Sequence, residues 1–368
     1  MGLLRIILAL SVVAGHSRSS IFGFNGVGAT VAVPVFFVIS GFYMAMILNE
    51  KYVSTPSSKF YASRAMRIYP IYFIGVMLAL LINHSEIYSI FKGLTTTPRI
   101  YMLISNLTIF GGDLTNQFCW LMQNGQCEKP IHLSFNAPAW SLSPELLFYL
   151  AAPAFIRSRK LTVLVWLIGC SYYYLIDGFS YPINKFGVLA YGNMTFIYSF
   201  FPSSVLYFAT GALGYHYIIK RNRVSYVMSL VMLIAICNVP LFIPPWMFVC
   251  LGIGIPSLFL LTKDIKLDRV IGELSYPVYI LHFPLVNLYD KLNINSAYLS
   301  KGSIVATIVV FISLVVYFLI DKRISKFRHE AIQGSADDLK STSNMPLRIY
   351  LTIYLIAPLV WICILKYV

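Results

Sequence analysis

Long runs of apolar residues recur along the whole chain and are separated by short polar segments. Most of these runs are long enough to cross a bilayer as an α-helix, which takes roughly 20 residues. The runs predict membrane-spanning helices at about residues 3–17, 27–48, 66–83, 139–156, 161–177, 196–219, 225–243, 246–262, 273–290, 303–320 and 347–366. The pattern therefore predicts an all-α fold, a polytopic integral membrane helical bundle.

A further apolar segment, YMLISNLTIFG near residues 100–110, is short and polar for a full crossing. The basic residues decide how it is placed, because the cytoplasmic loops of membrane proteins carry an excess of Lys and Arg. If the N-terminus is cytoplasmic and this segment does not cross, the basic clusters at 51–67, 157–160, 220–223, 263–269 and 322–328 all face the cytoplasm. We therefore expect residues 100–110 to be re-entrant or peripheral.

This topology gives a ten-helix core followed by one additional C-terminal helix. It divides the chain into a transmembrane domain at residues 1–323, a polar cytoplasmic loop at 324–346 and the additional transmembrane helix at 347–368. The loop 111–138 then lies on the oxidising side of the membrane, where Cys119 and Cys127 could form a disulfide.

The composition agrees with a membrane protein, since 58% of the 368 residues are hydrophobic and only 11% are charged. A formal net charge of +14 could suit a nucleic-acid-binding protein, but the Lys and Arg residues lie in the short connections between apolar runs. We therefore expect contact with membrane lipids and none with nucleic acid. The six cysteines have no metal-ligand spacing, and we expect no metal site.

Two ionisable side chains interrupt the first apolar run, Arg5 near its start and His16 near its end. Since no convincing cleavage site follows, we expect a retained span rather than a signal peptide. The two residues lie about three helical turns apart, so they point the same way on a helix and are separated by about 16 Å. A neutral imidazole inside the membrane suits a general base. The alternatives are an Arg5 that snorkels to the surface and a His16 that is hydrogen-bonded at a helix end.

The segment FYASRAMRIYP, residues 60–70, places Arg64 and Arg67 on one helix face where the chain emerges into the cytoplasm. Two guanidinium groups presented together suit phosphate groups, which they can bind bidentately. Ordinary positive-inside charge or contact with lipid headgroups would explain the same spacing.

Upstream of the arginines, Gly41 permits close approach of helices and Ser40 can hydrogen-bond across them, which is also typical of simple helix packing.

Glu145, in PAWSLSPELLFY at 138–149, lies several residues inside a predicted span, where an unpaired carboxylate is costly. We expect a histidine or arginine partner, which makes Glu145 a candidate for orienting His16, with a purely structural ion pair as the alternative. His282 lies in an aromatic-rich span and is either a supporting residue or a satisfied core histidine.

These segments together resemble the acyltransferase-3 family of integral-membrane acyltransferases, known from bacterial O-antigen and nodulation-factor acetylases. The resemblance covers about residues 3–323. It rests on Arg5-X10-His16, FFVISGF (36–42), Arg64-x-x-Arg67-IYP, WSLSPELLFY (140–149), SYPVYILHFPL (275–285) and YFLIDK (317–322). The family is described as having a ten-helix core, which agrees with the number of helices inferred from the basic clusters.

The resemblance implies transfer of an acetyl group from cytoplasmic acetyl-CoA to a hydroxyl of a surface glycan such as lipopolysaccharide O-antigen, at a bacterial inner membrane. It implies that Arg5, His16, Arg64 and Arg67 are essential. On this basis we expect His16, Arg5 and Glu145 to be catalytic, and Arg64, Arg67 and Arg5 to bind acetyl-CoA. Supporting roles fall to Ser40, Trp140, Ser141, Tyr276 and His282.

The chain departs from the family pattern in two places. Many members have WSLxxEE, whereas here Leu146 follows Glu145, so only one carboxylate remains. The terminal Glu-Lys-Pro of the family is replaced by Asp321-Lys322-Arg323. The first departure argues against any scheme that needs two adjacent carboxylates.

The sequence leaves two questions of mechanism open. His16 could remove the proton of the acceptor hydroxyl for direct transfer, or it could carry the acetyl group as a covalent intermediate. A transporter or flippase for a glycan or an anion is the rival class of protein. Against it, the sequence has no detectable inverted repeat.

Overall fold

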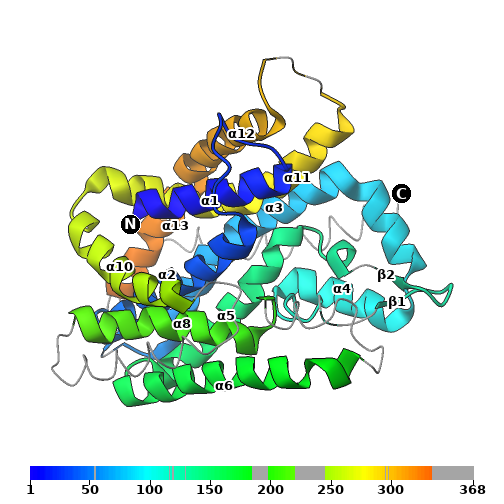
Figure 1. Cartoon of the computed structure of the whole chain (residues 1–368). Helices are drawn as coiled ribbons and strands as arrows, with labels where there is room; N and C mark the ends of the chain where they lie inside the picture. Colours follow the sequence, from blue (N-terminus) through cyan, green and yellow to red (C-terminus); the bar gives the residue numbers. More distant parts are fainter. Residues whose placement is uncertain are drawn as a thin grey trace.

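The computed structural model describes residues 1–53, 55–115, 117, 120–128, 130–184, 198–219, 245–294, 296 and 298–333, and these form a bundle of helices (Figure 1). The α-helices are α1 (Gly2–Ser17), α2 (Ala29–Glu50), α3 (Ser57–Gly93), α4 (Thr96–Thr108), α5 (Leu142–Phe155), α6 (Arg159–Asn184), α8 (Phe201–Gly214), α10 (Pro245–Thr262), α11 (Lys266–Lys291), α12 (Lys301–Val316) and α13 (Lys322–Gln333). Short helical segments are the 3-10 turns Pro130–Leu133 and Ala137–Ser141 and the π-helical turns Tyr215–Ile219 and Tyr317–Asp321.

Within the described residues, the hydrophobic runs identified in the sequence coincide with these helices, which confirms a helical fold with the features of a membrane protein. Three described helices are long and apolar enough to cross a bilayer: Ala29–Glu50, Ser57–Gly93 and Lys301–Arg328. Two shorter helices, Gly2–Ser17 and Cys250–Thr262, are also apolar. The predicted spans at 225–243 and 347–366 lie outside the described residues, and so do Cys119 and most of the predicted loop 324–346.

The segment that was not expected to cross the membrane forms α4, whose 13 residues extend about 20 Å. That length is shorter than a hydrocarbon core of about 30 Å. Asn106 fixes α4 to its surroundings, because its side chain donates to the Leu133 carbonyl at 2.7 Å and accepts from the Phe135 N–H at 2.8 Å. Next to it, β1 (Trp120–Leu121) and β2 (Cys127–Glu128) form a small antiparallel hairpin.

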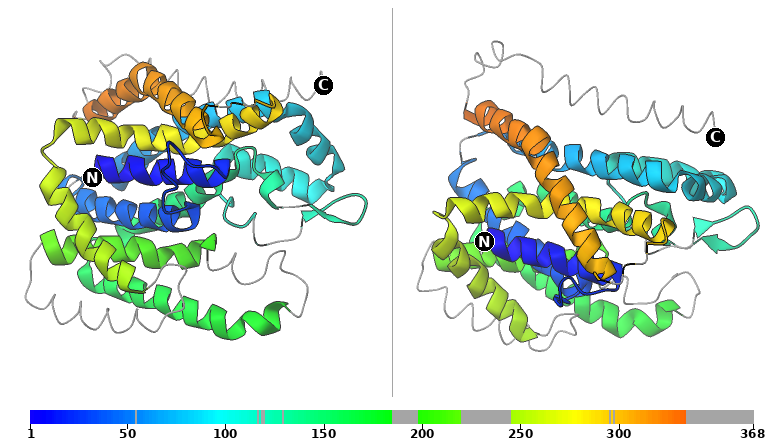
Figure 2. Two further views of the ribbon diagram at one scale, coloured as in Figure 1. Left: turned by 45° about the horizontal axis from the view of Figure 1, so that its top comes forward. Right: turned by 90° about the horizontal axis from the view of Figure 1, so that it is seen from above.

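Helices α1 and α11 pack side by side and run in the same direction (Figures 1 and 2). Their first turns meet where the Asp268 carboxylate accepts hydrogen bonds from the N–H groups of Gly2 and Leu3, at 2.7 and 2.8 Å. A Cβ atom at Gly2 would lie 1.5 Å from the Asp268 carbonyl oxygen, so only glycine permits this approach. Helix α12 lies obliquely across both helices.

Helices α2 and α8 make a second close contact, which depends on a pair of glycines. A Cβ atom at Gly41 would lie 1.9 Å from the Phe208 carbonyl oxygen, and one at Gly211 would lie 1.8 Å from the Val38 carbonyl oxygen. Small residues at helix crossings are typical of membrane bundles, where close packing replaces the hydrophobic driving force. The role expected for Gly41 is therefore confirmed.

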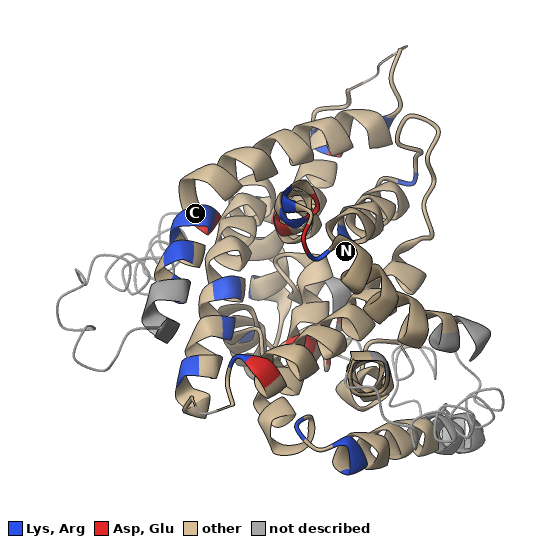
Figure 3. Ribbon diagram, turned by 90° about the vertical axis from the view of Figure 1, so that its left-hand side faces the viewer, with Lys and Arg blue, Asp and Glu red and all other residues tan. Residues whose placement is uncertain are grey.

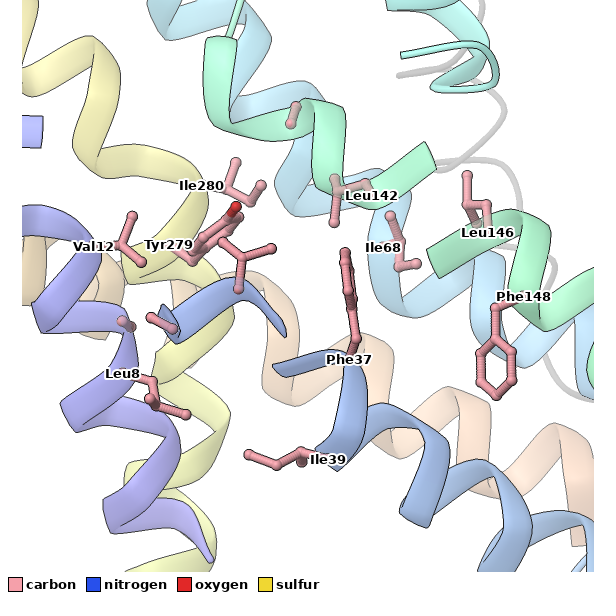
Figure 4. Close-up of a cluster of buried hydrophobic side chains, with 14 of the residues drawn as sticks. Leu8, Val12, Phe37, Ile39, Ile68, Leu142, Leu146, Phe148, Tyr279 and Ile280 are labelled. Carbon is pink, nitrogen blue, oxygen red and sulfur yellow. The ribbon is translucent and has the colours of Figure 1, made fainter. Parts of the chain in front are cut away.

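The core between these helices is built from large apolar side chains. Figure 4 shows part of it, in which Val12 of α1 lies near Tyr279 of α11, and Phe37 of α2 lies near Leu142 of α5. The outer faces are also apolar: Phe311 of α12 is 66% exposed and Ile168 of α6 is 58% exposed. Large apolar side chains exposed on the outer helices fit contact with lipid chains.

Candidate active site

A cavity of about 440 Å³ lies among α1, α2, α3, α5, α10, α11 and α13. Its lining follows α2 from Val33 to Lys51, or about 27 Å along the helix axis. Seven basic side chains line it: Arg5, Lys51, Arg64, Arg67, Lys263, Arg269 and Arg328. The acidic side chains in the lining are Glu145, Asp268 and Glu273, so the cavity has an excess of positive charge.

The basic residues are concentrated at one end of the bundle, which we call the basic end and define by Lys51, Lys263, Arg269 and Arg328. Figure 3 views the molecule from the left-hand side of Figure 1, where this end lies. Burial, together with the positive charges of Arg328 and Arg64, lowers the pKa of the Lys51 ammonium. An anion entering at this end therefore meets a positive potential.

Helix α3 carries Arg64 and Arg67 one turn apart, and both line the cavity. Arg64 is only 7% exposed, and its Nε has no hydrogen-bond partner among the described residues. Its guanidinium carbon lies 5.8 Å from the centre of the Phe60 ring and 5.9 Å from that of Tyr149. Arg64 is thus a buried cation held by aromatic rings, with hydrogen-bonding capacity left for a ligand.

Arg67 differs from Arg64 because it has an acidic partner. Its Nη1 lies 4.0 Å from an oxygen of Glu273 on α11. Arg5 of α1 lines the same part of the cavity and interacts electrostatically with both Glu273 and Arg67. The structure therefore brings together the three arginines that the sequence analysis assigned to binding of an anionic donor.

Asp268 fixes the start of α1 beside this cluster. Burial alone would raise the pKa of its carboxyl, but hydrogen bonds from the N-terminal ammonium and from the N–H groups of Gly2 and Leu3 hold that pKa well below its usual range. The ammonium of Met1 lies 2.5 Å from the carboxylate. The charged carboxylate at the helix N-terminus also complements the helix dipole.

Glu145 lies in the first turn of α5 and faces the cavity. It accepts hydrogen bonds from the Tyr149 hydroxyl and from Ser40 Oγ, the latter at 3.1 Å. On α11, Tyr276 donates its hydroxyl to the Ile68 carbonyl at 2.7 Å. A polar network of α2, α3, α5 and α11 thus surrounds the arginines.

The part of the cavity farthest from the basic end is lined by apolar and aromatic side chains, among them Val33, Phe36 and Tyr279. The Tyr279 hydroxyl is 2.8 Å from Ser141 Oγ and donates to the Pro138 carbonyl at 3.1 Å. This region suits an uncharged, extended part of a ligand rather than a phosphate.

His16 lies outside the cavity lining, behind Tyr279. Its Nδ1 is 2.7 Å from Nε2 of His282, and the two imidazole rings meet edge to edge in nearly parallel planes, with centroids 5.0 Å apart and an angle of 6° between the planes. Nδ1 of His282 is in turn 2.7 Å from the carbonyl oxygen of Tyr279. His282 is fully buried. A chain of hydrogen bonds therefore connects His16 to a residue in the cavity wall.

The structure differs from the expected arrangement around His16. Glu145 was expected to orient this imidazole, but it accepts hydrogen bonds from Tyr149 and Ser40, and His282 occupies the place beside His16. The reason is geometric, since Glu145 faces the cavity from α5 whereas His16 lies at the far end of α1. Trp140 also lies outside the cavity lining, with its ring 5.1 Å from that of Tyr198.

Three residues of the site were not singled out from the sequence: Glu273, Tyr149 and Tyr279. Tyr149 and Tyr279 lie within motifs that were noticed, whereas Glu273 lies just before the motif at 275–285. Glu273, Tyr276 and Tyr279 recur every three residues along one face of α11. This three-residue spacing predicts that Glu273 and Tyr279 share a helix face with Tyr276. Tyr149 follows Glu145 by four residues, and this i, i+4 spacing on one helix also indicates that the two side chains meet.

Comparisons with known proteins agree with this geometry. A family model described as an acyltransferase domain matches residues 1–322. Acyltransferase MdmB from Streptomyces mycarofaciens is 30% identical over 174 residues, which cover 44% of this chain and 40% of that protein. The match thus spans less than half of the length of this relative. No solved structure matches the chain.

Proposed function

This chain belongs to the acyltransferase-3 family, and from that premise we propose that it moves an acetyl group from acetyl-CoA to a hydroxyl of a bacterial surface glycan such as lipopolysaccharide O-antigen. Membership of the family makes the chain an acyltransferase. The donor, the acceptor and the roles of individual residues are the proposal.

The observation that carries the proposal is the buried guanidinium of Arg64 in a positively charged cavity. An unpartnered buried donor is costly, and an anionic ligand would remove that cost. Arg5, Arg64 and Arg67 together would hold the phosphates of acetyl-CoA. The elongated lining, charged at one end and apolar at the other, fits a ligand with a phosphorylated head and an extended uncharged arm.

The proposed orientation follows from the distribution of charge. The basic end of the bundle would face the cytoplasm, because basic segments are retained there, and the N-terminus would then be cytoplasmic in a bacterial inner membrane. The donor would enter from this end. The acceptor glycan would approach His16 from the opposite side of the membrane.

In the proposed reaction His16 accepts the proton of the acceptor hydroxyl. When bound, acetyl-CoA supplies the acyl group as an activated thioester. The acceptor oxygen forms a bond to the acyl carbon, the carbon–sulfur bond breaks, and the proton on His16 returns to the sulfur. Transfer through an acetyl-histidine obeys the same balance and stays an alternative. Glu145 would hold Tyr149 and Ser40 in place beside Arg64.

Transfer of labelled acetyl from acetyl-CoA into cell-envelope glycan tests the proposal. Membranes would contain wild-type protein, His16→Ala, Arg64→Met or the control Arg99→Met, at equal abundance. Arg99 is suitable because it lies on α4, outside the cavity lining, and donates to the Lys92 carbonyl. We expect label with the wild type and with Arg99→Met only.

Each other outcome is informative. Equal labelling by His16→Ala would exclude a role for His16 as the base. Absence of label from the wild type, combined with no binding of acetyl-CoA to the purified protein, would refute the proposed donor. Binding without labelling of the glycan would refute the proposed acceptor.

A further inference from the structure

Two histidines from helices far apart in the sequence meet end to end at the end of α1, although neither lines the cavity. His16 and His282 are joined by a 2.7 Å contact between Nδ1 of the first and Nε2 of the second. We infer that His282 is a positioning residue, which fixes the tautomer of His16 so that Nε2 of His16 is the atom that receives the acceptor proton. The inference rests on the proposed acyl transfer and assigns a further residue to it.

The hydrogen-bond chain determines where the protons are. The Tyr279 carbonyl oxygen can only accept, so Nδ1 of His282, 2.7 Å away, must carry a hydrogen and donate it. A neutral imidazole has a single N–H, and therefore Nε2 of His282 is an acceptor. His16 must then donate from its Nδ1. Nε2 of a neutral His16 is consequently left with a free lone pair.

The surroundings distinguish the two rings. His282 has no exposed surface, whereas His16 is partly exposed, so only His16 can meet a substrate. The His16 ring is held by the hydrogen-bonded edge of His282 and by the edge-on ring of Phe283, whose centroid is 5.5 Å away. The imidazole is thus fixed both in rotation and in tautomer.

A shared metal ion does not explain the contact. Two imidazole nitrogens bound to one tetrahedral zinc ion would be about 3.3 Å apart, given zinc–nitrogen distances of about 2.0–2.1 Å. The observed 2.7 Å is a hydrogen-bond distance. Among the described residues, moreover, no group of three or more His, Cys, Asp or Glu side chains is placed to hold a metal.

The arrangement parallels the carboxylate–histidine pair of a catalytic triad, with an imidazole and a backbone carbonyl in place of the carboxylate. When Nε2 of His16 takes the hydroxyl proton, His16 becomes an imidazolium. Nε2 of His282 accepts from the Nδ1–H of His16 both before and after this transfer. The proton leaves His16 again when the thiolate of the donor is protonated. His282 itself gains and loses no proton.

The test compares His282→Leu, which removes the acceptor, with His282→Gln, whose Oε1 can accept from His16 where Nε2 did. His84→Gln, at an exposed histidine of α3, is the matched control. The first measurement is carbethoxylation of His16 by diethyl pyrocarbonate in purified protein without substrates, followed by mass spectrometry. The second is kcat and KM for acetyl transfer from acetyl-CoA.

We expect His282→Leu to slow carbethoxylation of His16 at least fivefold and to lower kcat at least tenfold, with KM for acetyl-CoA unchanged. His282→Gln should restore both to within about threefold of wild type, and His84→Gln should match wild type. A purely structural role for His282 would not be rescued by Gln, because packing of a flat ring is not restored by an amide.

Two results would overturn the inference. One is a His282→Leu protein that binds acetyl-CoA normally and shows wild-type carbethoxylation of His16. The other is a His282→Gln protein that is folded and binds acetyl-CoA but is as impaired as His282→Leu. Because carbethoxylation needs neither donor nor acceptor, failure of the proposed acyl transfer would leave this measurement intact, and the two failures can be told apart.

Discussion

Replacing Arg64 by Met should separate the stability of the protein from its affinity for the donor. The guanidinium is buried, and among the described residues its Nε has no hydrogen-bond partner and no carboxylate oxygen lies within ion-pair distance. The thioether of Met keeps the length and flexibility of the side chain without its charge. The substitution therefore removes a ligand contact and a buried charge together.

The magnitudes follow from these contacts. The two ring contacts at 5.8 and 5.9 Å lie near the limit for cation–π attraction, and losing them costs about 1–2 kcal/mol in total. Removing a buried, unpaired charge raises the free energy of unfolding by several kcal/mol. The free energy of unfolding should thus stay equal or rise. Loss of a charge-assisted hydrogen bond to phosphate costs about 1.5–3 kcal/mol, or about 10- to 150-fold in Kd.

The assay is the thermal midpoint of purified protein in detergent, measured over a range of acetyl-CoA concentrations. Bound ligand raises the midpoint by mass action, so one titration reports both stability and affinity. We expect Arg64→Met to start at or above the wild-type midpoint and to need at least tenfold more acetyl-CoA for the same rise. Arg99→Met, outside the cavity, should follow the wild-type curve.

A lower starting midpoint with undiminished affinity would refute the reasoning. It would mean that Arg64 stabilises the fold and that the cavity binds acetyl-CoA without it. Wild-type behaviour in both respects would equally exclude Arg64 from the binding site.

Three further predictions concern neighbouring features. Glu273→Gln removes the carboxylate partner that lies 4.0 Å from Arg67, and we expect acetyl-CoA to bind about two- to fivefold more tightly in the same titration. Weaker binding would show that Glu273 orders Arg67 for the donor phosphates rather than competing with them for Arg67. Gly211→Ala places a Cβ 1.8 Å from the Val38 carbonyl oxygen and should lower the free energy of unfolding by about 1–3 kcal/mol. Gly254→Ala is the control and should be neutral or slightly stabilising, because no atom lies within 4 Å of the new Cβ. Equal thermal midpoints for the two variants would contradict close packing of α2 and α8. The pKa of Asp268 is lowered in the folded protein, so the stability that its charge contributes is complete above the unfolded carboxyl pKa of about 3.9 and is lost as the pH falls below it. The difference in thermal midpoint between wild type and Asp268→Asn should therefore shrink from about pH 5 downward. A difference that persists unchanged to pH 3 would be inconsistent with this linkage.

The parts of the site that were predictable from the sequence are those that depend on one helix at a time. Arg64 and Arg67 were placed on one face by their i, i+3 spacing, and both line the cavity. Arg5 and His16 were expected to point the same way, and both face α11, where Arg5 lies near Gly272 and His16 contacts His282. Helical periodicity fixes such relations without knowledge of any partner.

The pairings between helices were not predictable. Glu145 needed a partner inside the membrane, but the sequence contains no information that α2 faces it and that Ser40 donates to it at 3.1 Å. His282 was noted for its position in an aromatic span, yet nothing local indicates that it meets His16. Such contacts are set by helix packing, and periodicity within one helix does not encode it.

The parallel packing of α1 against α11 also sets the order in which the protein can mature during synthesis. The partners of Gly2 and His16 lie 266 residues later in the chain. At a translation rate of about 5–20 residues per second, α1 waits roughly 13 to 53 s for α11 to be made. During that time the N–H groups of Gly2 and Leu3 lack the Asp268 carboxylate, and the imidazole of His16 has no fixed tautomer. A ribosome that stalls before α11 therefore leaves a first helix without the carboxylate that accepts from its N-terminal N–H groups and without the ring that accepts from His16.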